Sequence, residues 1–367
     1  MEQKSKAVVC REIGKPVVVE EILVEAPRRG ELMIKLSACG VCHGDLSATN
    51  GTIPFPPPVV LGHEGAGVVV AVGEGVSDYA VGDHVVSSFV SMCGKCRYCQ
   101  TGRPQLCDQA ARAAAPLPDG TVRTRDLAGN PLSVFSGCGV MAEYATLHAD
   151  NVVKIDQQMP LDRAALIGCG VMTGVGAAVN TAQVDPGSVT VVFSCGGVGL
   201  SAIQGCHIAG ARMIVAVDTS DAKLEMARQF GATHTLNSRN EENPAKALLK
   251  LTGGADFAFE CVGSGEVVAL AYGVLGKGGT AVVVGVANPK DTTSIRTASL
   301  TFGEKTLTGS YFGSARPRQD FPRLIGLYRA GRLKLDELIT RTYSIDEAPQ
   351  AFEDMQAGRN ARGVIVF

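Results

Sequence analysis

Four cysteines lie close together in the segment CGKCRYCQTGRPQLC, residues 93–107. Two residues separate Cys93 from Cys96 and Cys96 from Cys99, and Cys107 follows after seven more. Short C-x-x-C spacings are typical of zinc sites in chains from a reducing compartment, where disulfides are rare. Four thiolates complete a tetrahedral zinc and leave no position for water or substrate. We therefore expect a structural zinc here and the chemistry elsewhere.

A catalytic zinc needs a different site, because it binds three protein ligands and keeps a fourth position open. Thiol, imidazole and carboxylate side chains outside the four-cysteine lobe are the candidates for this site. Spacing alone does not choose among them. They are Cys39, Cys42, His43, His63, Glu64, His84 and Cys169.

The segment SCGGVG, residues 194–199, lies between an expected strand and an expected helix. A dinucleotide-binding loop requires glycine at its first, third and sixth positions. Here Ser194 takes the first position, Gly196 and Gly199 take the other two, and Gly197 lies between them. A plain strand-to-helix turn is the alternative, but the placement favours a dinucleotide site.

Asp218 ends the next expected strand, where an acidic side chain binds the adenosine ribose hydroxyls. A negative charge there also repels the 2′-phosphate of NADP. At about 5 Å and an effective dielectric constant near 20, this repulsion is roughly 3 kcal/mol per unit charge. The alternative role for Asp218 is a helix N-cap. The sequence thus predicts NAD as the cofactor.

Two different patterns of elements would position these residues. Up to about residue 170, short strands alternate with Gly and Pro turns, as in residues 31–40 and 66–89, which predicts a barrel-like β domain. Residues 54–60, PFPPPVV, form an extended connector, because proline lacks an amide donor for a central strand.

From about residue 188, buried strands and helices alternate regularly, which predicts an α/β doubly wound parallel sheet. We expect Gly210 and Gly231 to end its first two helices. The amphipathic residues 321–333 and the final GVIVF could extend this sheet or return to the first domain. The pattern alone does not decide between them.

Length, charge and composition restrict the class of protein. With 367 residues the chain is long enough for two domains, and a formal net charge of -2 offers no electrostatic attraction for nucleic acid or an anionic membrane. The first residues, MEQKSKAVVCREIG, lack an apolar signal core, and we find no apolar run of membrane length. We expect a cytoplasmic protein whose twelve cysteines are reduced.

Several motifs together resemble the zinc-containing medium-chain alcohol dehydrogenases, in the order and at roughly the spacing of that family. The segment at residues 116–137 is similar to the loop of the longer, dimeric type, so the resemblance implies a homodimer. The resemblance covers essentially the whole chain. The motifs are CGVCHGDL, LGHEGAG, the four-cysteine lobe, GCGVMTGVGAA, the glycine loop and RGVIVF.

The resemblance implies a catalytic zinc held by Cys42, His63 and Cys169, the ligand types already known for alcohol dehydrogenases. Glu64 would lie behind the metal, where it would either support the ligands or bind the metal transiently. Zinc would lower the pKa of the substrate hydroxyl, and NAD would accept a hydride from its carbon. The activity implied is interconversion of a primary or secondary alcohol with an aldehyde or ketone.

The resemblance also implies a GroES-like β-rich catalytic domain, residues 1–170, and a Rossmann cofactor domain, residues 171–310. Residues 311–367 would return to the catalytic domain. Such a chain would therefore hold two zinc ions and one NAD.

Family positions give roles to four further residues. His43 and Arg362 would contact the cofactor pyrophosphate, although both could be ordinary surface cations. Phe89 and Val286 are assigned to an apolar substrate pocket suited to aryl, allylic or medium-chain alcohols, with a core position as the alternative for Phe89.

Three positions depart from the family pattern. Gly44 stands where the family has a Ser or Thr that relays the alcohol proton, Ser47 stands where a relay His is common, and Ser194 replaces a loop glycine. Two alternatives therefore stay open: glutathione-dependent oxidation of formaldehyde, as S-hydroxymethylglutathione, and a non-catalytic, zinc-stabilised NAD-binding protein.

Overall fold

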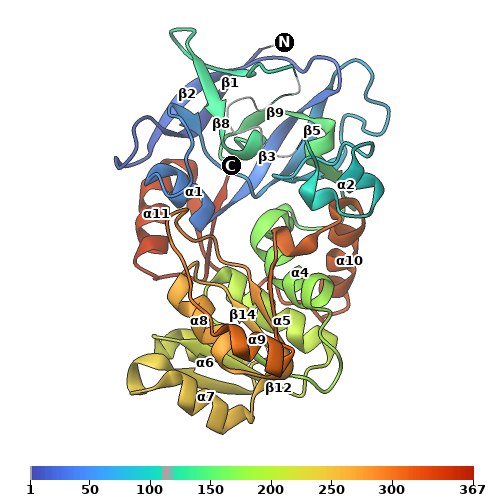
Figure 1. Cartoon of the computed structure of the whole chain (residues 1–367). Coiled ribbons are helices and arrows are strands. Elements are labelled where there is room, and N and C mark those ends of the chain that lie inside the picture. Colours follow the sequence, from blue (N-terminus) through green and yellow to red (C-terminus); the bar gives the residue numbers. More distant parts are fainter. Residues whose placement is uncertain (1, 110–116, 118) are drawn as a thin grey trace. The chain divides into compact units, whose positions relative to one another are not determined.

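The computed structural model describes residues 2–109, 117 and 119–367 (Figure 1). The chain divides into two compact units. Unit 1 contains Met1–Cys169, Arg316–Ala330 and Leu335–Phe367, and unit 2 contains Gly170–Ala315 and Gly331–Lys334. Within the segment similar to the long loop of dimeric relatives, residues 116 and 118 lie outside the described residues.

Unit 1 contains a small closed sheet of short strands, as expected from its Gly and Pro turns. Its first two strands pair antiparallel from Gln3 opposite Val24 to Val9 opposite Val18. Residues 59–60 of the proline-rich connector join the closed sheet as a two-residue strand. In sheet order, the strands are β1 (Gln3–Cys10), β2 (Val18–Val24), β7 (Thr124–Asp126), β8 (Pro131–Val134) and β4 (Val59–Val60).

A second, larger sheet of unit 1 carries the C-terminal strand of the chain. Strand β18 pairs antiparallel with β3, from Gly363 opposite Val41 to Val366 opposite Ala38. The final GVIVF thus belongs to this sheet and does not extend the parallel sheet of unit 2. The sheet order is β10 (Val152–Lys154), β6 (His84–Ser87), β5 (Gly65–Val72), β3 (Glu31–Val41), β18 (Arg362–Val366) and β17 (Ile339–Ser344), and β9 (Tyr144–His148) also pairs with β3.

Helices of unit 1 are short apart from two near the C-terminus. The amphipathic segment predicted at residues 321–333 lies mainly in α10. The α-helices are α1 (His43–Thr49), α2 (Arg97–Gln100), α3 (Leu161–Leu166), α10 (Pro317–Arg329) and α11 (Ala348–Gln356), and 3-10 turns lie at Pro104–Leu106, Phe135–Gly137, Ala149–Asn151 and Ile345–Glu347.

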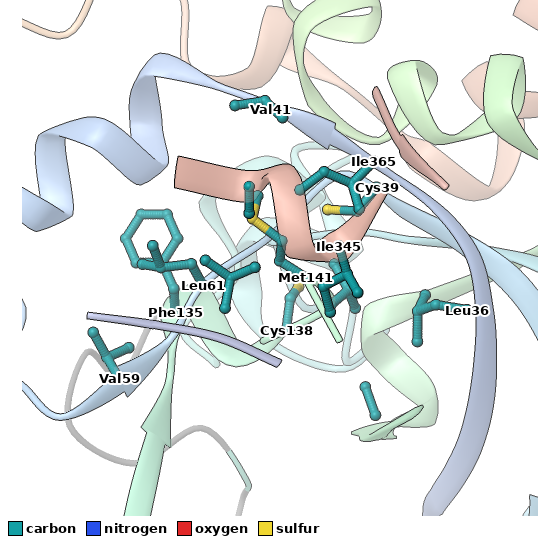
Figure 2. Close-up of a cluster of buried hydrophobic side chains, with 14 of the residues drawn as sticks. Leu36, Cys39, Val41, Val59, Leu61, Phe135, Cys138, Met141, Ile345 and Ile365 are labelled. Carbon is teal, nitrogen blue, oxygen red and sulfur yellow. The ribbon is translucent and has the colours of Figure 1, made fainter. Parts of the chain in front are cut away.

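The core of unit 1 joins segments that are far apart in the sequence. Leu36, Cys39 and Val41 of β3 pack in one buried cluster with Phe135 and Ile365 (Figure 2). Burial of such side chains is the main force that holds the segments together.

Unit 2 is the predicted doubly wound sheet, with every strand parallel to its neighbours. Strand β11 is buried along its whole length, as expected for a sheet covered on both faces. From β11 the chain adds β12 and β13 on one side of the sheet, and it then crosses to the other side to add β14. The order of strands reverses between β11 and β14, and ligands of such folds bind at this point. The sheet order is β13 (His234–Asn237), β12 (Met213–Asp218), β11 (Val189–Phe193), β14 (Ala255–Glu260), β15 (Leu275–Val283) and β16 (Thr306–Gly309).

The helices of unit 2 end largely as predicted. Gly210 follows α5 with a φ of 88°, and Gly231 lies two residues beyond α6 with a φ of 109°. The helices are α4 (Met172–Gly176), α5 (Gly197–Ala209), α6 (Asp221–Gln229), α7 (Pro244–Thr252), α8 (Gly265–Gly273) and α9 (Thr297–Gly303), with short turns at Ala177–Ala182, Ser238–Asn240 and Phe312–Ser314. A further helical turn, Ile167–Val171, spans the point where the chain passes from unit 1 to unit 2.

One continuous helical stretch in the described part of the chain, Leu161–Ala182, is long and apolar enough to cross a membrane by composition. Of its most apolar window, 78% is buried inside the protein. Such burial is what the core helix of a soluble protein shows.

Candidate active site

The four cysteines of the lobe converge as predicted. The sulfur atoms of Cys93, Cys96, Cys99 and Cys107 all lie within 4.8 Å of one another. Separations of 4.0 Å between Cys93 and Cys99, and 3.8 Å between Cys96 and Cys107, suit the edges of a sulfur tetrahedron around zinc.

Backbone amides in the lobe point toward these sulfurs. The amide of Cys96 donates to Cys93 Sγ at 3.3 Å, the amide of Cys99 to Cys96 Sγ at 3.4 Å, and the amide of Gln109 to Cys107 Sγ at 3.4 Å. The bond from Cys99 is the main reason that the pKa of Cys96 falls to about 6. The loop therefore favours the thiolate, the form that binds a metal, at Cys96. Burial acts in the opposite direction at the other end of the lobe, where it raises the pKa of Cys99 to about 12 and also raises that of Cys107.

A second group of donors is formed by Cys42, His63, Glu64 and Cys169, whose ligand atoms also lie within 4.8 Å of one another. Cys42 precedes α1, the histidine and glutamate lie between β4 and β5, and Cys169 lies in the helical turn Ile167–Val171. All four belong to unit 1. Two sulfurs and one imidazole are a donor set that suits zinc.

Three other candidate ligands lie outside both groups among the described residues. Cys39 is buried, and desolvation raises the pKa of its thiol well above the ordinary value. His84 lies in β6 and pairs through its backbone with Val68. His43 is exposed at the first turn of α1.

The imidazole of His63 is oriented by a carboxylate. Asp45 Oδ1 lies 3.2 Å from His63 Nδ1 and also accepts a 2.8 Å hydrogen bond from the amide of Gly62. Because Nδ1 is engaged, Nε2 is the nitrogen left to face the two cysteines. Burial lowers the pKa of His63, but Asp45 and Cys42 outweigh burial and raise it well above the usual range.

Cys42 is the sulfur most readily ionised in this group. A hydrogen bond from Cys169 lowers the pKa of Cys42 well below its ordinary value, burial opposes this change, and His63 adds to it. The structure thus favours negative charge on Cys42, as a zinc ligand requires.

Glu64 and Arg362 form a buried ion pair beside the donors. Burial raises the pKa of Glu64 to about 7, although Arg362 opposes the shift. Gly40 is required next to them, because a Cβ there would overlap the carboxylate of Glu64. Arg362 is therefore not an ordinary surface cation, which was the alternative considered for it.

Phe89 and Gly44 lie against His63. The Phe89 ring is partly buried, packs on the core cluster and contacts the imidazole edge-on, with centroids 5.7 Å apart. A Cβ built on Gly44 would lie 3.0 Å from His63 Cε1 and 3.9 Å from Cys42 Sγ. Any side chain at position 44 would therefore face the donor group.

In unit 2, the glycine loop makes a tight turn between β11 and α5. Ser194 takes the unusual φ of 87°, in the region that favours glycine, and its hydroxyl accepts a 3.2 Å bond from the amide of Gly196. A Cβ on Gly199 would overlap the backbone oxygen of Ser194. Gly197 begins α5, a helix of 13 residues whose first amides face the loop.

Asp218 is held at the end of β12 by backbone amides. Its carboxylate accepts bonds of 2.8 Å from Cys195, 2.7 Å from Thr219 and 3.1 Å from Ser220. The N-cap of the following helix is Ser220, so the alternative role of Asp218 as that N-cap is wrong. Val286 lies after β15 and is 64% exposed.

Comparison with known proteins identifies the family. Residues 28–157 match the family model described as the alcohol dehydrogenase GroES-like domain, and residues 197–330 match that of a zinc-binding dehydrogenase. An NDMA-dependent alcohol dehydrogenase from Amycolatopsis methanolica is 44% identical over 369 residues, which cover 99% of each chain. The chain belongs to the zinc-containing medium-chain alcohol dehydrogenases.

Two further members of this family are similar over their full lengths. S-(hydroxymethyl)glutathione dehydrogenase from Paracoccus denitrificans is 39% identical over 99% of this chain and 100% of its own. The crystal structure of benzyl alcohol dehydrogenase from Acinetobacter calcoaceticus has a TM-score of 0.93 and 34% identity, covering 100% of this chain and 99% of its own.

Family membership confirms the predicted fold class, GroES-like and Rossmann domains, and the predicted class of enzyme, a zinc-dependent alcohol oxidoreductase. The alternative of a non-catalytic protein loses its support, because relatives similar over the whole chain are described as dehydrogenases. The glutathione-dependent alternative is represented among relatives but is not better supported.

Sequence reasoning missed two residues of this alcohol dehydrogenase site. Asp45 follows Cys42 by three residues in CGVCHGDL, and an acidic residue so close to a metal ligand is a signal that could have been used. Phe135, whose ring contacts His63, has no such signal, because it lies 72 positions after His63 in the sequence.

Proposed function

We propose that this alcohol dehydrogenase transfers a hydride between NAD and a primary or secondary alcohol of the aryl, allylic or medium-chain type, giving an aldehyde or ketone. The observation that carries the proposal is the convergence of Cys42, His63 and Cys169 within 4.8 Å in a chain of this family. The four-cysteine lobe is closed, so it would hold a second, structural zinc.

Each residue of the open group has a separate task. Cys42, His63 and Cys169 hold the zinc, Asp45 fixes the imidazole, and Glu64 lies beside the donors with its charge balanced by Arg362. Zinc in such a site acts as a Lewis acid that lowers the pKa of a hydroxyl, and NAD accepts the hydride. His63 and Glu64 are buried, which limits the access of competing water to the group.

The cofactor would be held mainly by unit 2. The amides at the start of α5 bind the pyrophosphate, and Gly196 allows its close approach. Asp218 binds the adenosine ribose and selects NAD over NADP by charge repulsion. His43 and Arg362 are proposed as the cationic contacts to the pyrophosphate, with Arg362 acting from its pair with Glu64.

Apolar and small residues beside the donor group support the proposed alcohol class. Phe89 contacts His63, and a glycine at position 44 leaves space beside the donor atoms. Val286 is the proposed apolar contact from unit 2. A relative described as a benzyl alcohol dehydrogenase supports an aryl alcohol. We also propose a cytoplasmic homodimer, because the segment at residues 116–137 is similar to that of the longer, dimeric type.

S-(hydroxymethyl)glutathione is the second candidate substrate, favoured by the 39% identical relative. An assay across primary, secondary, aryl and allylic alcohols with NAD, with and without glutathione and formaldehyde, separates the two candidates. The assay is repeated with NDMA, because another relative is described as dependent on it. Activity only when glutathione and formaldehyde are both present would reject the first proposal.

Metal analysis of the purified protein tests the site itself. We expect about two zinc ions per chain, one in each donor group. Cys42→Ser should abolish turnover with little loss of thermal stability, whereas Cys93→Ser should lower thermal stability. One zinc per chain, or full turnover in Cys42→Ser, would contradict the proposed site.

A further inference from the structure

The imidazole of His63 lies between two phenyl rings from different segments of unit 1. Its ring centroid is 5.4 Å from that of Phe135, with an interplanar angle of 77°, and 5.7 Å from that of Phe89, with an angle of 90°. Both contacts are edge-to-face, the geometry in which aromatic rings attract each other.

The remaining sides of the imidazole are also occupied. Asp45 holds Nδ1, and a Cβ on Gly44 would lie only 3.0 Å from Cε1. His63 is 4% exposed, so it has little freedom to turn. Rotation of the ring away from the cysteines would require Phe135 or Phe89 to move.

Phe135 is itself firmly supported. It is buried, and its ring contacts Phe55 with centroids 5.4 Å apart at 74°. It directly follows β8, which pairs with β4 and β7 in the closed sheet. The position of Phe135 is thus set by a sheet that supplies no metal ligand.

The segment that carries Phe135 is anchored at its other end by a buried ion cluster. Arg123 donates to both carboxylate oxygens of Glu31, at 2.9 and 2.6 Å, and to Asp119 at 2.7 Å. Arg123 and Glu31 are both buried, so this cluster holds its geometry better than a surface pair would.

We infer that Phe135 is a positioning residue for the metal-binding imidazole, acting through its edge contact with His63. The inference rests on the proposed function in one respect, since it takes His63 as a ligand of the open zinc site. Phe135 would restrict rotation of the imidazole through this ring contact, and its phenyl side chain carries no group that could transfer a proton or a hydride. A less confined imidazole would release the metal faster.

Phe55 provides a matched control. Both phenyl rings are buried and contact each other, and of these two it is Phe135 whose ring also contacts His63. Phe135→Leu and Phe55→Leu remove similar apolar area from the same cluster. A loss of packing alone would therefore affect both variants, whereas a loss of ligand orientation would affect only the first.

The test measures zinc transfer from the holoenzyme to a chelator, together with thermal midpoints and the visible spectrum of the cobalt-substituted protein. We expect both variants to have lower midpoints. Only Phe135→Leu should lose zinc from the open site about two- to tenfold faster than wild type, and only its cobalt spectrum should shift. Phe135→Met, which fills the space with a flexible side chain, is measured in parallel in case the leucine variant does not fold.

Equal rates of zinc loss in wild type, Phe135→Leu and Phe135→Met would overturn the inference, as would equal acceleration in Phe55→Leu. Failure of the proposed function gives a different result, because wild type itself would then hold no zinc in the open site. Because Cys42→Ser removes a proposed ligand of the open site, the phase of zinc release that this variant lacks is the phase that belongs to that site.

Discussion

Asp45 Oδ1 lies 3.2 Å from His63 Nδ1, and the same oxygen accepts a hydrogen bond from the amide of Gly62. The carboxylate is buried and precedes its partner by 18 residues. It therefore ties the first turn of α1 to the loop that carries His63. Carboxylates placed in this way fix both the tautomer and the direction of a metal-binding imidazole.

Replacing Asp45 with Asn should weaken zinc binding in the open site. The amide keeps the size of the side chain but removes the charge that favours the Nδ1–H tautomer, so we expect about a ten- to hundredfold loss of zinc affinity there. Competition with a chelator measures this loss. Asp320→Asn, a change at another buried carboxylate of unit 1, is the control and should leave zinc binding intact. Wild-type affinity in Asp45→Asn would show that the carboxylate does not orient the ligand.

Two glycines of the cofactor loop should respond differently to alanine. At Gly199 a Cβ would overlap the backbone of Ser194, so Gly199→Ala should lower the thermal midpoint by several degrees. At Gly196 the nearest atom to a Cβ is the Ser194 hydroxyl at 3.5 Å, so the fold should tolerate Gly196→Ala.

The cost of Gly196→Ala should instead fall on cofactor binding, because a methyl group there obstructs the approach of the pyrophosphate. We expect at least about a tenfold weaker binding of NAD with an unchanged midpoint. Fluorescence titration with NADH and thermal unfolding separate the two effects. Unchanged NADH affinity in this variant would place the pyrophosphate elsewhere.

Asp218→Asn tests cofactor choice while largely preserving the loop. Its remaining side-chain oxygen can still accept a backbone hydrogen bond, whereas deletion of the side chain in Asp218→Gly would also remove the three amide contacts. The variant loses the repulsion of roughly 3 kcal/mol between the Asp218 charge and the 2′-phosphate of NADP. The ratio of kcat/KM with NAD to kcat/KM with NADP should therefore fall by up to about a hundredfold. Equal use of both cofactors by wild type would refute the role of the charge.

Local patterns predicted most of the fold, because each strand and helix carries its own periodicity. The parallel sheet of unit 2 follows from apolar runs that alternate with glycine-ended helices. The sequence did not predict which sheet the final GVIVF joins, because the sequence of a buried strand looks the same in the sheet of unit 1 and in that of unit 2. Its pairing with β3 depends on contacts more than 300 residues apart in the chain.

The parts of the candidate site that were predictable are the metal ligands, because these residues occur in short sequence motifs. Cysteine spacing indicated the lobe, and family resemblance indicated Cys42, His63 and Cys169. The supports of these ligands were harder to predict, because Phe135 and Arg362 reach the site only through tertiary packing. Arg362 looked like a cofactor contact or a surface cation, and its pairing with Glu64 became visible only in the fold.

Gly44 stands where the family resemblance leads us to expect a Ser or Thr that relays the alcohol proton, and it adjoins the donor group. Without the usual hydroxyl, proton transfer lacks a positioned acceptor, a deficit that typically costs about a hundredfold in rate. An ordered water could take this role, because glycine leaves room beside His63 and Cys42. The same room would admit bulky or secondary alcohols.

Gly44→Ser distinguishes these two accounts. Its Cβ would lie 3.0 Å from His63 Cε1 and 3.3 Å from Nε2, so the new hydroxyl would stand beside the donor atoms after a shift of a few tenths of an ångström. If the relay is missing, turnover of a small primary alcohol should rise and its pH dependence should move to lower pH. If water already relays the proton, small alcohols should change little, and bulky ones should slow because the side chain takes their space. The measurement is turnover as a function of pH, with one small and one bulky alcohol, in wild type and in Gly44→Ser. Identical profiles of the two proteins would show that position 44 controls neither proton transfer nor the space for the alcohol.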